Sequence, residues 1–321
     1  MTTRRLWLAL ALAVAIAPPA NAAGPPLPSA ASGATGASAP GGAERLLTRR
    51  AGGDTLVSAV RIGDNRVLRS RQIHGRWWVP AVTINGATTG LAADGSTLVL
   101  VRPERAFPPP NTKLAVLDAG QLRVEREITL PGFFTVDAIS PDGRWLYLIQ
   151  YPDEDFLDYH VRALDTRTGR LDPRDVVDPR KPREQMGGLP MTRALSRDGR
   201  WAYTLYGGNE VFIHALDTVN RTAACVDLEM LPRNSDLSGV QLAVSPGGAR
   251  VEVRDNGDLI ATVDARTFAV NEPGREPVAT PAPTTSHGDS FPWPALLIGT
   301  VLAGGCAVLL ARRRATVGSS V

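Results

Sequence analysis

Two short sequence markers recur in the same order along the chain, and this recurrence constrains the fold more than any other feature. The first marker is a pair of β-rich segments joined by a Gly-containing turn. It occurs four times, with turn residues Asp94, Asp142, Asp198 and Gly247 that lie 48, 56 and 49 residues apart. Glycine suits such a turn because it tolerates the positive φ that a tight hairpin requires. The first marker therefore predicts four hairpins at a nearly constant spacing.

The second marker is an aspartate that closes a β-rich segment and opens another turn. It occurs at Asp118, Asp165, Asp217 and Asp264, with spacings of 47, 52 and 47 residues. Two markers that keep step in this way predict a repeated four-stranded unit, the blade of a β-propeller. A β-sandwich is the alternative all-β fold, but a sandwich does not require two markers in register.

The amino-acid sequences of the markers resemble those of a known family. Residues 140–147 read SPDGRWLY and residues 164–170 read LDTRTGR, and residues 196–203 repeat the first pattern. In these segments the chain resembles the bacterial YVTN/WD-repeat-like β-propellers, and the resemblance extends over residues 88–270. It implies an all-β propeller of about five four-stranded blades. It implies little about function, because this fold hosts many activities.

The start of the domain departs from the repeat. Residues 54–84 supply three β-rich segments, DTLVSAVRIG, NRVLRSRQI and RWWVPAVTI, without the marker turn. We interpret them as strands two to four of a divergent first blade. A strand from the opposite end of the domain would then close the ring. An open or a six-bladed arrangement is the alternative.

The two ends of the chain predict export and membrane anchoring. Arg4 and Arg5, an apolar run and the small-x-small sequence Ala20 to Ala22 are typical of a secretory signal, with ordinary and twin-arginine export both open. Near the other end, an uninterrupted apolar stretch precedes Arg312 to Arg314, as in a single transmembrane helix whose arginines stay in the cytoplasm. The expected organisation is a signal peptide (1–22), an Ala/Gly/Ser/Pro linker (23–43), a β-propeller domain (44–271), a Pro/Thr-rich stalk (272–294), a transmembrane helix (295–311) and a cytoplasmic tail (312–321).

The net charge agrees with this topology. The chain has 35 basic and 32 acidic residues, a formal charge of +3, but five of the arginines lie in the signal peptide or beyond the apolar stretch. The remainder has 30 basic and 32 acidic residues, a formal charge of −2. The basic character of the chain therefore belongs to its targeting segments, and we expect no nucleic-acid partner.

Sequence motifs for specific chemistry are missing. The sequence contains no HExxH, GxSxG, Walker or EF-hand pattern. The four histidines lie far apart, and His160 and His214 fall in equivalent third strands, where strand packing is the simpler role. We therefore predict no catalytic residue, no metal site and no cofactor.

Long loops indicate where a partner would bind. If the marker turns share one face, then the longer insertions 102–112, 151–159, 178–190 and 231–238 share the opposite face. These loops supply candidate binding residues, although ordinary solvated loop charges are the alternative interpretation. The candidates are an acidic group (Asp153, Glu154, Asp155 and Asp158) and a basic group (Arg180, Lys181 and Arg183), with Arg102 and Arg105 beside them.

Two functional classes follow. The first is a non-enzymatic binding or scaffolding module, held outside the cell membrane by one helix, with an envelope protein or wall component as its partner. The second is a hydrolase or lactonase of the propeller type with an axial site. The innermost strands read mostly apolar, with Asp137 and Arg193 as exceptions, so these two residues are the candidates for an axial site. Further carboxylates beside them would favour the enzyme.

Overall fold

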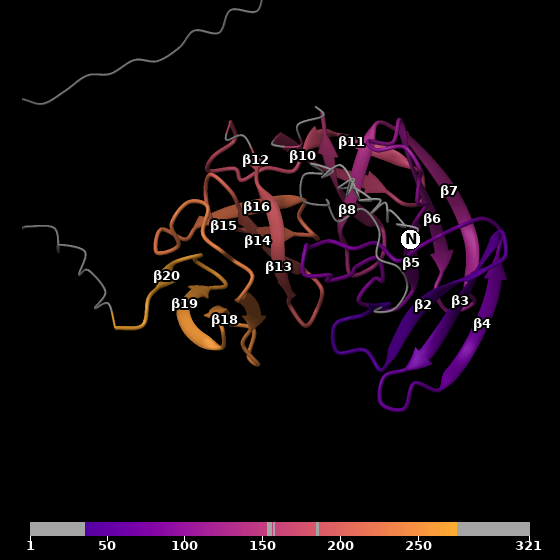
Figure 1. Ribbon diagram of the computed structural model, residues 1–321, viewed down its shortest axis with the longest axis horizontal. Helices are drawn as coiled ribbons and strands as arrows, with labels where there is room; N and C mark the ends of the chain where they lie inside the picture. The colour runs from indigo at the N-terminus through magenta and orange to yellow at the C-terminus, as the bar shows by residue number, and fades with distance from the viewer. Residues whose placement is uncertain (1–35, 153–155, 157, 184–185, 275–321) are drawn as a thin grey trace, which may run out of the picture. The chain divides into compact units, whose positions relative to one another are not determined.

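The computed structural model describes residues 36–152, 156, 158–183 and 186–274. This part of the chain is all-β, contains no helix, and forms five antiparallel sheets that follow one another in sequence order (Figure 1). Within it, no helix is long and apolar enough to cross a membrane. The predicted signal peptide, stalk, transmembrane helix and tail fall outside the described residues, apart from the first residues of the stalk.

Three of the five sheets are four-stranded meanders, the second consists of three strands, and the third is a four-stranded meander with a fifth, short strand. The first sheet comprises β1 (Ala37–Ser38), β2 (Glu44–Ala51), β3 (Asp54–Arg61) and β4 (Val67–Ile73). The second comprises β5 (Thr97–Val101), β6 (Asn111–Asp118) and β7 (Arg123–Pro131). The third comprises β8 (Phe133–Ile139), β9 (Trp145–Tyr151), β10 (Asp158–Asp165) and β11 (Arg170–Asp175), and β12 (Met186–Gly187) pairs with β10. The fourth comprises β13 (Leu189–Leu195), β14 (Trp201–Gly207), β15 (Phe212–Asp217) and β16 (Thr222–Asp227), and the fifth comprises β17 (Val240–Val244), β18 (Arg250–Asp255), β19 (Asp258–Asp264) and β20 (Val270–Asn271).

The sheets pack face to face through layers of buried apolar side chains. β15 shows why both faces of a middle sheet are apolar: Phe212 and Leu216 enter the layer shared with the third sheet, whereas Ile213 and Ala215 enter the layer shared with the fifth. Because successive strand residues point to opposite faces, a strand between two layers is buried throughout its length. Successive meanders stacked in this manner are the blades of a β-propeller.

The described residues show four such layers for five sheets. They join the first sheet to the second, the second to the third, the third to the fourth, and the fourth to the fifth. Within the described ranges, no strand of the fifth sheet pairs with a strand of the first. The expected closure by a strand from the opposite end is therefore absent from this part of the chain, since the first sheet takes its own first strand, β1, from residues 37–38.

The divergent first blade was only partly predicted from the sequence. The segments DTLVSAVRIG and NRVLRSRQI form β3 and β4, but the expected strand in RWWVPAVTI is wrong. That segment makes single bridges at Trp78 and Ala81 on its way into the second sheet. The missing strand is β2, and β1 before it lies within the expected linker and buries Ala37 against the first layer.

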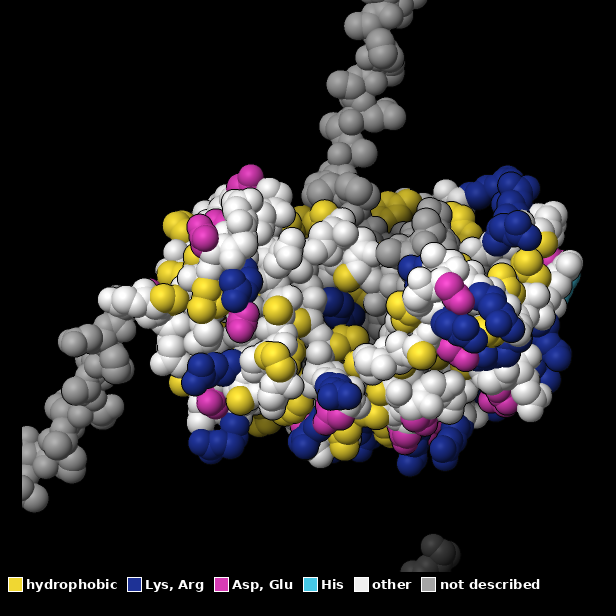
Figure 2. Space-filling view, turned by 90° about the horizontal axis from the view of Figure 1, so that it is seen from below, with side chains coloured by type: hydrophobic (Ala, Val, Ile, Leu, Met, Phe, Trp, Pro, Cys, Tyr) yellow, Lys and Arg dark blue, Asp and Glu magenta, His cyan; other side chains and the backbone are white. Residues whose placement is uncertain are grey.

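The connection between the first and second sheets also reaches the fourth sheet. The backbone N of Ile84 donates to the carbonyl of Pro190 at 2.9 Å, and the N of Asn85 donates to that of Met191 at 3.4 Å. Residues 84–85, which precede the second sheet, are thus hydrogen-bonded to β13 of the fourth sheet. Figure 2 looks onto the edge at the bottom of Figure 1 and shows a recess in it, with a basic side chain set back inside.

Candidate functional site

The marker turns form a face built from hydrogen bonds within the turns. In the turn before β14, the hydroxyl of Ser196 donates to Asp198 at 2.6 Å and accepts from the backbone N of Trp201 at 2.8 Å. Ser140 and Asp142 repeat this pattern before β9. Asx and hydroxyl bonds of this kind fix a turn locally. The recurring Ser-x-Asp-Gly pattern is therefore explained by turn formation.

The aspartates of the second marker fasten the third-to-fourth turns in the same way. Asp217 accepts from the backbone N of Val219 and of Asn220, both at 3.0 Å, and from Nη2 of Arg200 at 2.7 Å. Burial acts to raise the pKa of the Asp217 carboxyl, but the bonds from Arg200 and the turn hold that pKa below its usual value. Asp217 and Arg200 therefore stabilise the blade, and the carboxylate of Asp217 is engaged in hydrogen bonds within it.

The opposite face carries aromatic side chains that the sequence analysis did not select. Phe107, from the connection between β5 and β6, lies with its ring centroid 5.4 Å from Phe133 of β8 and 5.2 Å from Phe156. Tyr151, at the end of β9, stacks on Phe133 at 5.3 Å and lies 5.7 Å from Phe156. We call Phe107, Phe133, Tyr151 and Phe156 the aromatic group. Phe107 is 59% exposed, so the group reaches the surface.

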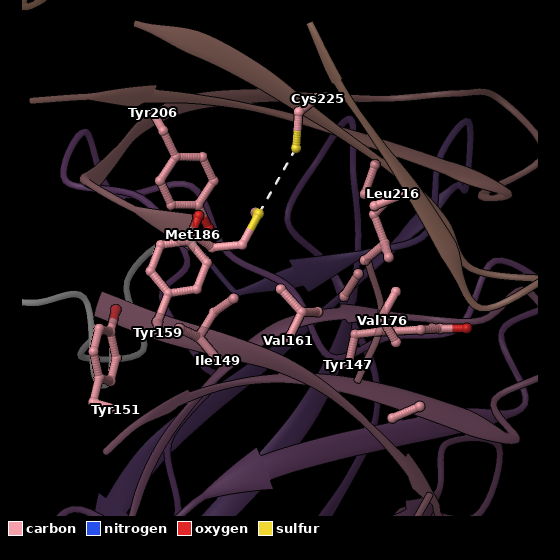
Figure 3. Close-up of a cluster of buried hydrophobic side chains, with 14 of the residues drawn as sticks. Tyr147, Ile149, Tyr151, Tyr159, Val161, Val176, Met186, Tyr206, Leu216 and Cys225 are labelled. Carbon is pink, nitrogen blue, oxygen red and sulfur yellow. Dashed lines mark hydrogen bonds between the residues drawn. The ribbon is translucent and has the colours of Figure 1, made fainter. Parts of the chain in front are cut away.

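The aromatic group continues inward along the layer between the third and fourth sheets. Tyr159 of β10 lies 6.3 Å from Tyr151 and stacks on Tyr206 of β14 at 5.3 Å, and Tyr206 stacks on Phe212 at the same distance (Figure 3). Burial raises the pKa of Tyr151 to about 12, and it raises the pKa of Tyr159 and of Tyr206 well above the usual value. These phenols are therefore neutral at physiological pH and can serve as hydrogen-bond donors.

The two axial candidates come together in the structure. Arg193 of β13 and Asp137 of β8 form an ion pair with Nη2 3.5 Å from Oδ1, and their side chains are 4% and 2% exposed. Arg193 also donates from Nη1 to the backbone carbonyl of Asp137. Among the described residues, neither carboxylate oxygen of Asp137 has a hydrogen-bond partner, and the same holds for Nε and Nη2 of Arg193. A buried charged pair with unused donors and acceptors is costly, which sets it apart from the turn residues.

The loop candidates are distributed less simply than predicted. Asp153, Glu154 and Asp155 lie outside the described residues. Asp158 is half-buried in β10 opposite Gly187, so it does not extend an exposed acidic lobe. Nη2 of Arg180 lies 2.6 Å from Oδ2 of Asp178, and Nζ of Lys181 lies 3.0 Å from Oδ2 of Asp227. Two of the three charges of the expected basic group are therefore paired with carboxylates.

The remaining candidates from the long loops are Arg102, Arg105 and Arg183. Arg183 and Arg105 are exposed, and the guanidinium of Arg102 lies 5.7 Å from the ring centroid of Trp77. The sequence does hold a signal for the aromatic group, because Phe107 begins the run FPPP and Phe156 interrupts the acidic run after Tyr151. In the described ranges, no three His, Cys, Asp or Glu side chains cluster as a metal site would require. His160 is exposed and lies 2.8 Å from Asp175, whereas its counterpart His214 is fully buried.

Comparison with known proteins gives similarity at the level of fold. No protein-family model matches the chain. No curated protein matches it either. Among solved structures, hydrazine synthase of Kuenenia stuttgartiensis is similar at 14% identity and a TM-score of 0.37, over 73% of this chain and 81% of that one.

Two further solved structures are similar to a comparable degree. They are the Cps50 (Swd1) β-propeller domain of Myceliophteria thermophila (12% identity, TM-score 0.43, 73% of this chain and 65% of that one) and apo AztD of Citrobacter koseri (13% identity, TM-score 0.38, 71% and 58%). The chain spans less than two thirds of the length of these two structures. At such identities and scores the matches assign no activity to this chain.

Proposed function

We propose that this protein is an extracytoplasmic binding module, in which an apolar segment of an envelope protein docks on the aromatic group. The observation that supports the proposal most strongly is the convergence of aromatic rings from three separate chain segments on one face, with Phe107 left 59% exposed. Aromatic side chains at the surface are enriched among the residues that dominate binding energy.

The chemistry of the surrounding loops suggests the character of the partner. Arg105, two residues before Phe107, and Arg183 are exposed, whereas Arg180 and Lys181 are paired with aspartates. A segment with one bulky apolar side chain and flanking carboxylates would complement this arrangement, because rim charges steer association while the buried anchor supplies the affinity. The marker-turn face also carries aromatic rings, with Trp201 5.5 Å from Phe268, but both of these side chains are partly buried, whereas Phe107 is exposed.

The predicted topology belongs to the same proposal. A signal peptide at 1–22 and a membrane helix at 295–311 would hold the domain outside the cell membrane with the stalk 272–294 as a spacer. Membrane fractions of cells that express the full chain should retain it after an alkaline carbonate wash. A variant truncated after residue 294 should instead be released in soluble form, and release of the full chain by the wash would contradict the anchor.

A paired substitution tests the binding face. The full chain with Phe107→Ala should lose cross-links to its envelope partner, while the chain with Val219→Ala should retain them. Val219 is 53% exposed in a third-to-fourth turn of the opposite face, so its substitution removes a similar exposure away from the aromatic group. Equal cross-linking by the two variants, with both folded by circular dichroism, would contradict the proposed face.

The enzymatic alternative rests on Asp137 and Arg193 alone. An axial hydrolase would need further polar groups beside them, and Arg193 is the cation that Asp137 contacts.

A further inference from the structure

The layer between the third and fourth sheets contains sulfur atoms from two different elements. The thiol of Cys225 in β16 donates to the thioether of Met186 in β12, with Sγ and Sδ 3.7 Å apart (Figure 3). Cys225 is 7% exposed and Met186 is 8% exposed. On its own this pair is ordinary packing of soft apolar side chains.

A buried histidine lies on the strand next to Cys225, with its ring centroid 6.2 Å from that of Tyr206. His214 of β15 is fully buried, and neither ring nitrogen finds a hydrogen-bond partner among the described residues. Buried imidazoles are normally bonded through at least one nitrogen, because an unsatisfied buried polar group costs about 1–3 kcal/mol. Both ring nitrogens of His214 are therefore left without a hydrogen-bond partner in the described part of the chain.

The strand register places His214 against the sulfur atoms. His214 is the direct cross-strand partner of Cys225 in the pairing of β15 with β16. Directly opposite residues share a face of the sheet, with Cβ atoms about 4.5–5.5 Å apart. The neighbours of His214 on that face, Phe212 and Leu216, lie in the same buried layer as Cys225 and Met186. The thiol of Cys225 thus contacts the thioether of Met186, and the unpartnered imidazole of His214 faces the same layer from the strand next to Cys225.

We propose that Cys225, Met186 and His214 bind a soft monovalent cation, Cu(I), in the layer between the third and fourth sheets. Thiolate and thioether donors select Cu(I) over harder cations, and neutral imidazole suits it as a third ligand. Binding forms a Cu–S bond at Cys225 and releases the thiol proton to solvent, so the thiolate and the cation form a neutral unit. This neutrality suits an apolar layer, where an uncompensated charge would be costly.

Anaerobic titration of the full chain tests the site. Bathocuproine disulfonate competes for Cu(I), and the protein carries Cys306→Ser so that Cys225 is its sole cysteine. We expect one Cu(I) bound per chain, one proton released per ion, and sulfur and nitrogen neighbours of copper in X-ray absorption spectra. Because altering even an outer-shell residue costs about 10–100-fold in metal affinity, Met186→Leu and His214→Gln should each weaken Cu(I) binding by at least about tenfold, and Cys225→Ala should weaken it most.

Matched variants keep the result interpretable. Met191→Leu makes the same chemical change at a half-buried methionine in the layer between the fourth and fifth sheets, and it should leave Cu(I) affinity unchanged. Met186→Leu keeps the side-chain volume and should fold as the parent does. Failure to compete with the chelator, or equal affinity of the Met186→Leu and Met191→Leu chains, would overturn the proposal. Neither result bears on the aromatic group.

Discussion

Arg193 of β13 and Arg200 of the turn before β14 form Arg–Asp pairs of opposite character. Arg200 and Asp217 lie at the marker-turn end, where Nη2 and Oδ2 are 2.7 Å apart, Arg200 is 42% exposed, and Asp217 also accepts bonds from the turn backbone. Arg193, which pairs with Asp137 of the third sheet, is 4% exposed at a longer 3.5 Å contact that leaves both carboxylate oxygens without a hydrogen bond in the described part of the chain.

The difference between the two pairs separates structural residues from candidate functional ones. The pair that belongs to the recurring marker is saturated by local bonds, and it stabilises a turn. The pair that departs from the repeat is buried, so the two charges lose their hydration at a large free-energy cost. Because the contact between them is long and the carboxylate has no hydrogen bond among the described residues, their attraction offsets only part of that cost. In this chain the recurring marker residues therefore indicate turn formation, whereas polar residues that break the repeat, such as Asp137 and Arg193, are the candidates for a functional site.

The largest expected effect comes from breaking the buried pair. Arg193→Met leaves the Asp137 charge buried and uncompensated, so we expect the free energy of unfolding to fall by about 3–5 kcal/mol in urea titrations. The double variant Asp137→Ala with Arg193→Met removes both charges and should recover most of that loss, because a buried pair exchanged for apolar groups is often nearly neutral. If the double variant is as unstable as Arg193→Met, the pair contributes to stability and the contrast with the turn pair fails.

A smaller effect is expected at the turn pair. Asp217→Ala removes a carboxylate that holds both Arg200 and the turn, and we expect a loss of about 2–3 kcal/mol in the same titration. Asp118→Ala is the matched control in the second sheet, where the described bond is to the backbone N of Gln121 at 2.8 Å, and its loss should be smaller. Unlike the buried pair, the double variant with Arg200→Ala should recover nothing, because the turn N–H groups of Val219 and Asn220 stay unsatisfied. Recovery of stability there would erase the distinction between the two pairs.

The pH dependence of stability sharpens the comparison through a third pair, Asp178 with Arg180. Burial acts to raise the pKa of Asp178, but bonds from Arg180 and from the backbone N of Cys225 lower it to about 2 from the usual 3.8. A carboxyl with a depressed folded-state pKa stabilises the protein above its unfolded pKa and loses that contribution as pH falls. We expect about 2 kcal/mol to disappear between pH 3.8 and pH 2.

The measurement for this pair is unfolding by urea at a series of acidic pH values. The Asp178→Asn variant should begin less stable at neutral pH and should show a shallower decline over the same window. An identical pH profile for the variant and the parent would show that Asp178 does not carry this dependence.

The sequence predicted the blades more completely than the site. The two markers located the turns correctly, because a Ser, an Asp and a Gly fix a turn through bonds only a few residues apart. The strand expected before the Asp94 turn is wrong, since that segment forms only isolated bridges at Thr88 and Leu91. The prediction of the first blade was partly wrong because that blade lacks those local signals. RWWVPAVTI has the composition of a strand, but it pairs only through single bridges. The aromatic group was missed because Phe107 and Phe156 meet across 49 residues of sequence, and no local pattern records such a contact.

The sequence by itself determined the all-β class, the blade period and the position of each marker turn, since all of these depend on alternation and on short-range hydrogen bonds. Asp137 and Arg193 could be selected in the same way, as polar exceptions in apolar strands. Only the tertiary structure decided that these two form an ion pair, that the described sheets share four layers, that His214 lies opposite Cys225, and that Cys225 contacts Met186. These facts depend on which strand faces are brought together, and that is decided by the packing of whole sheets.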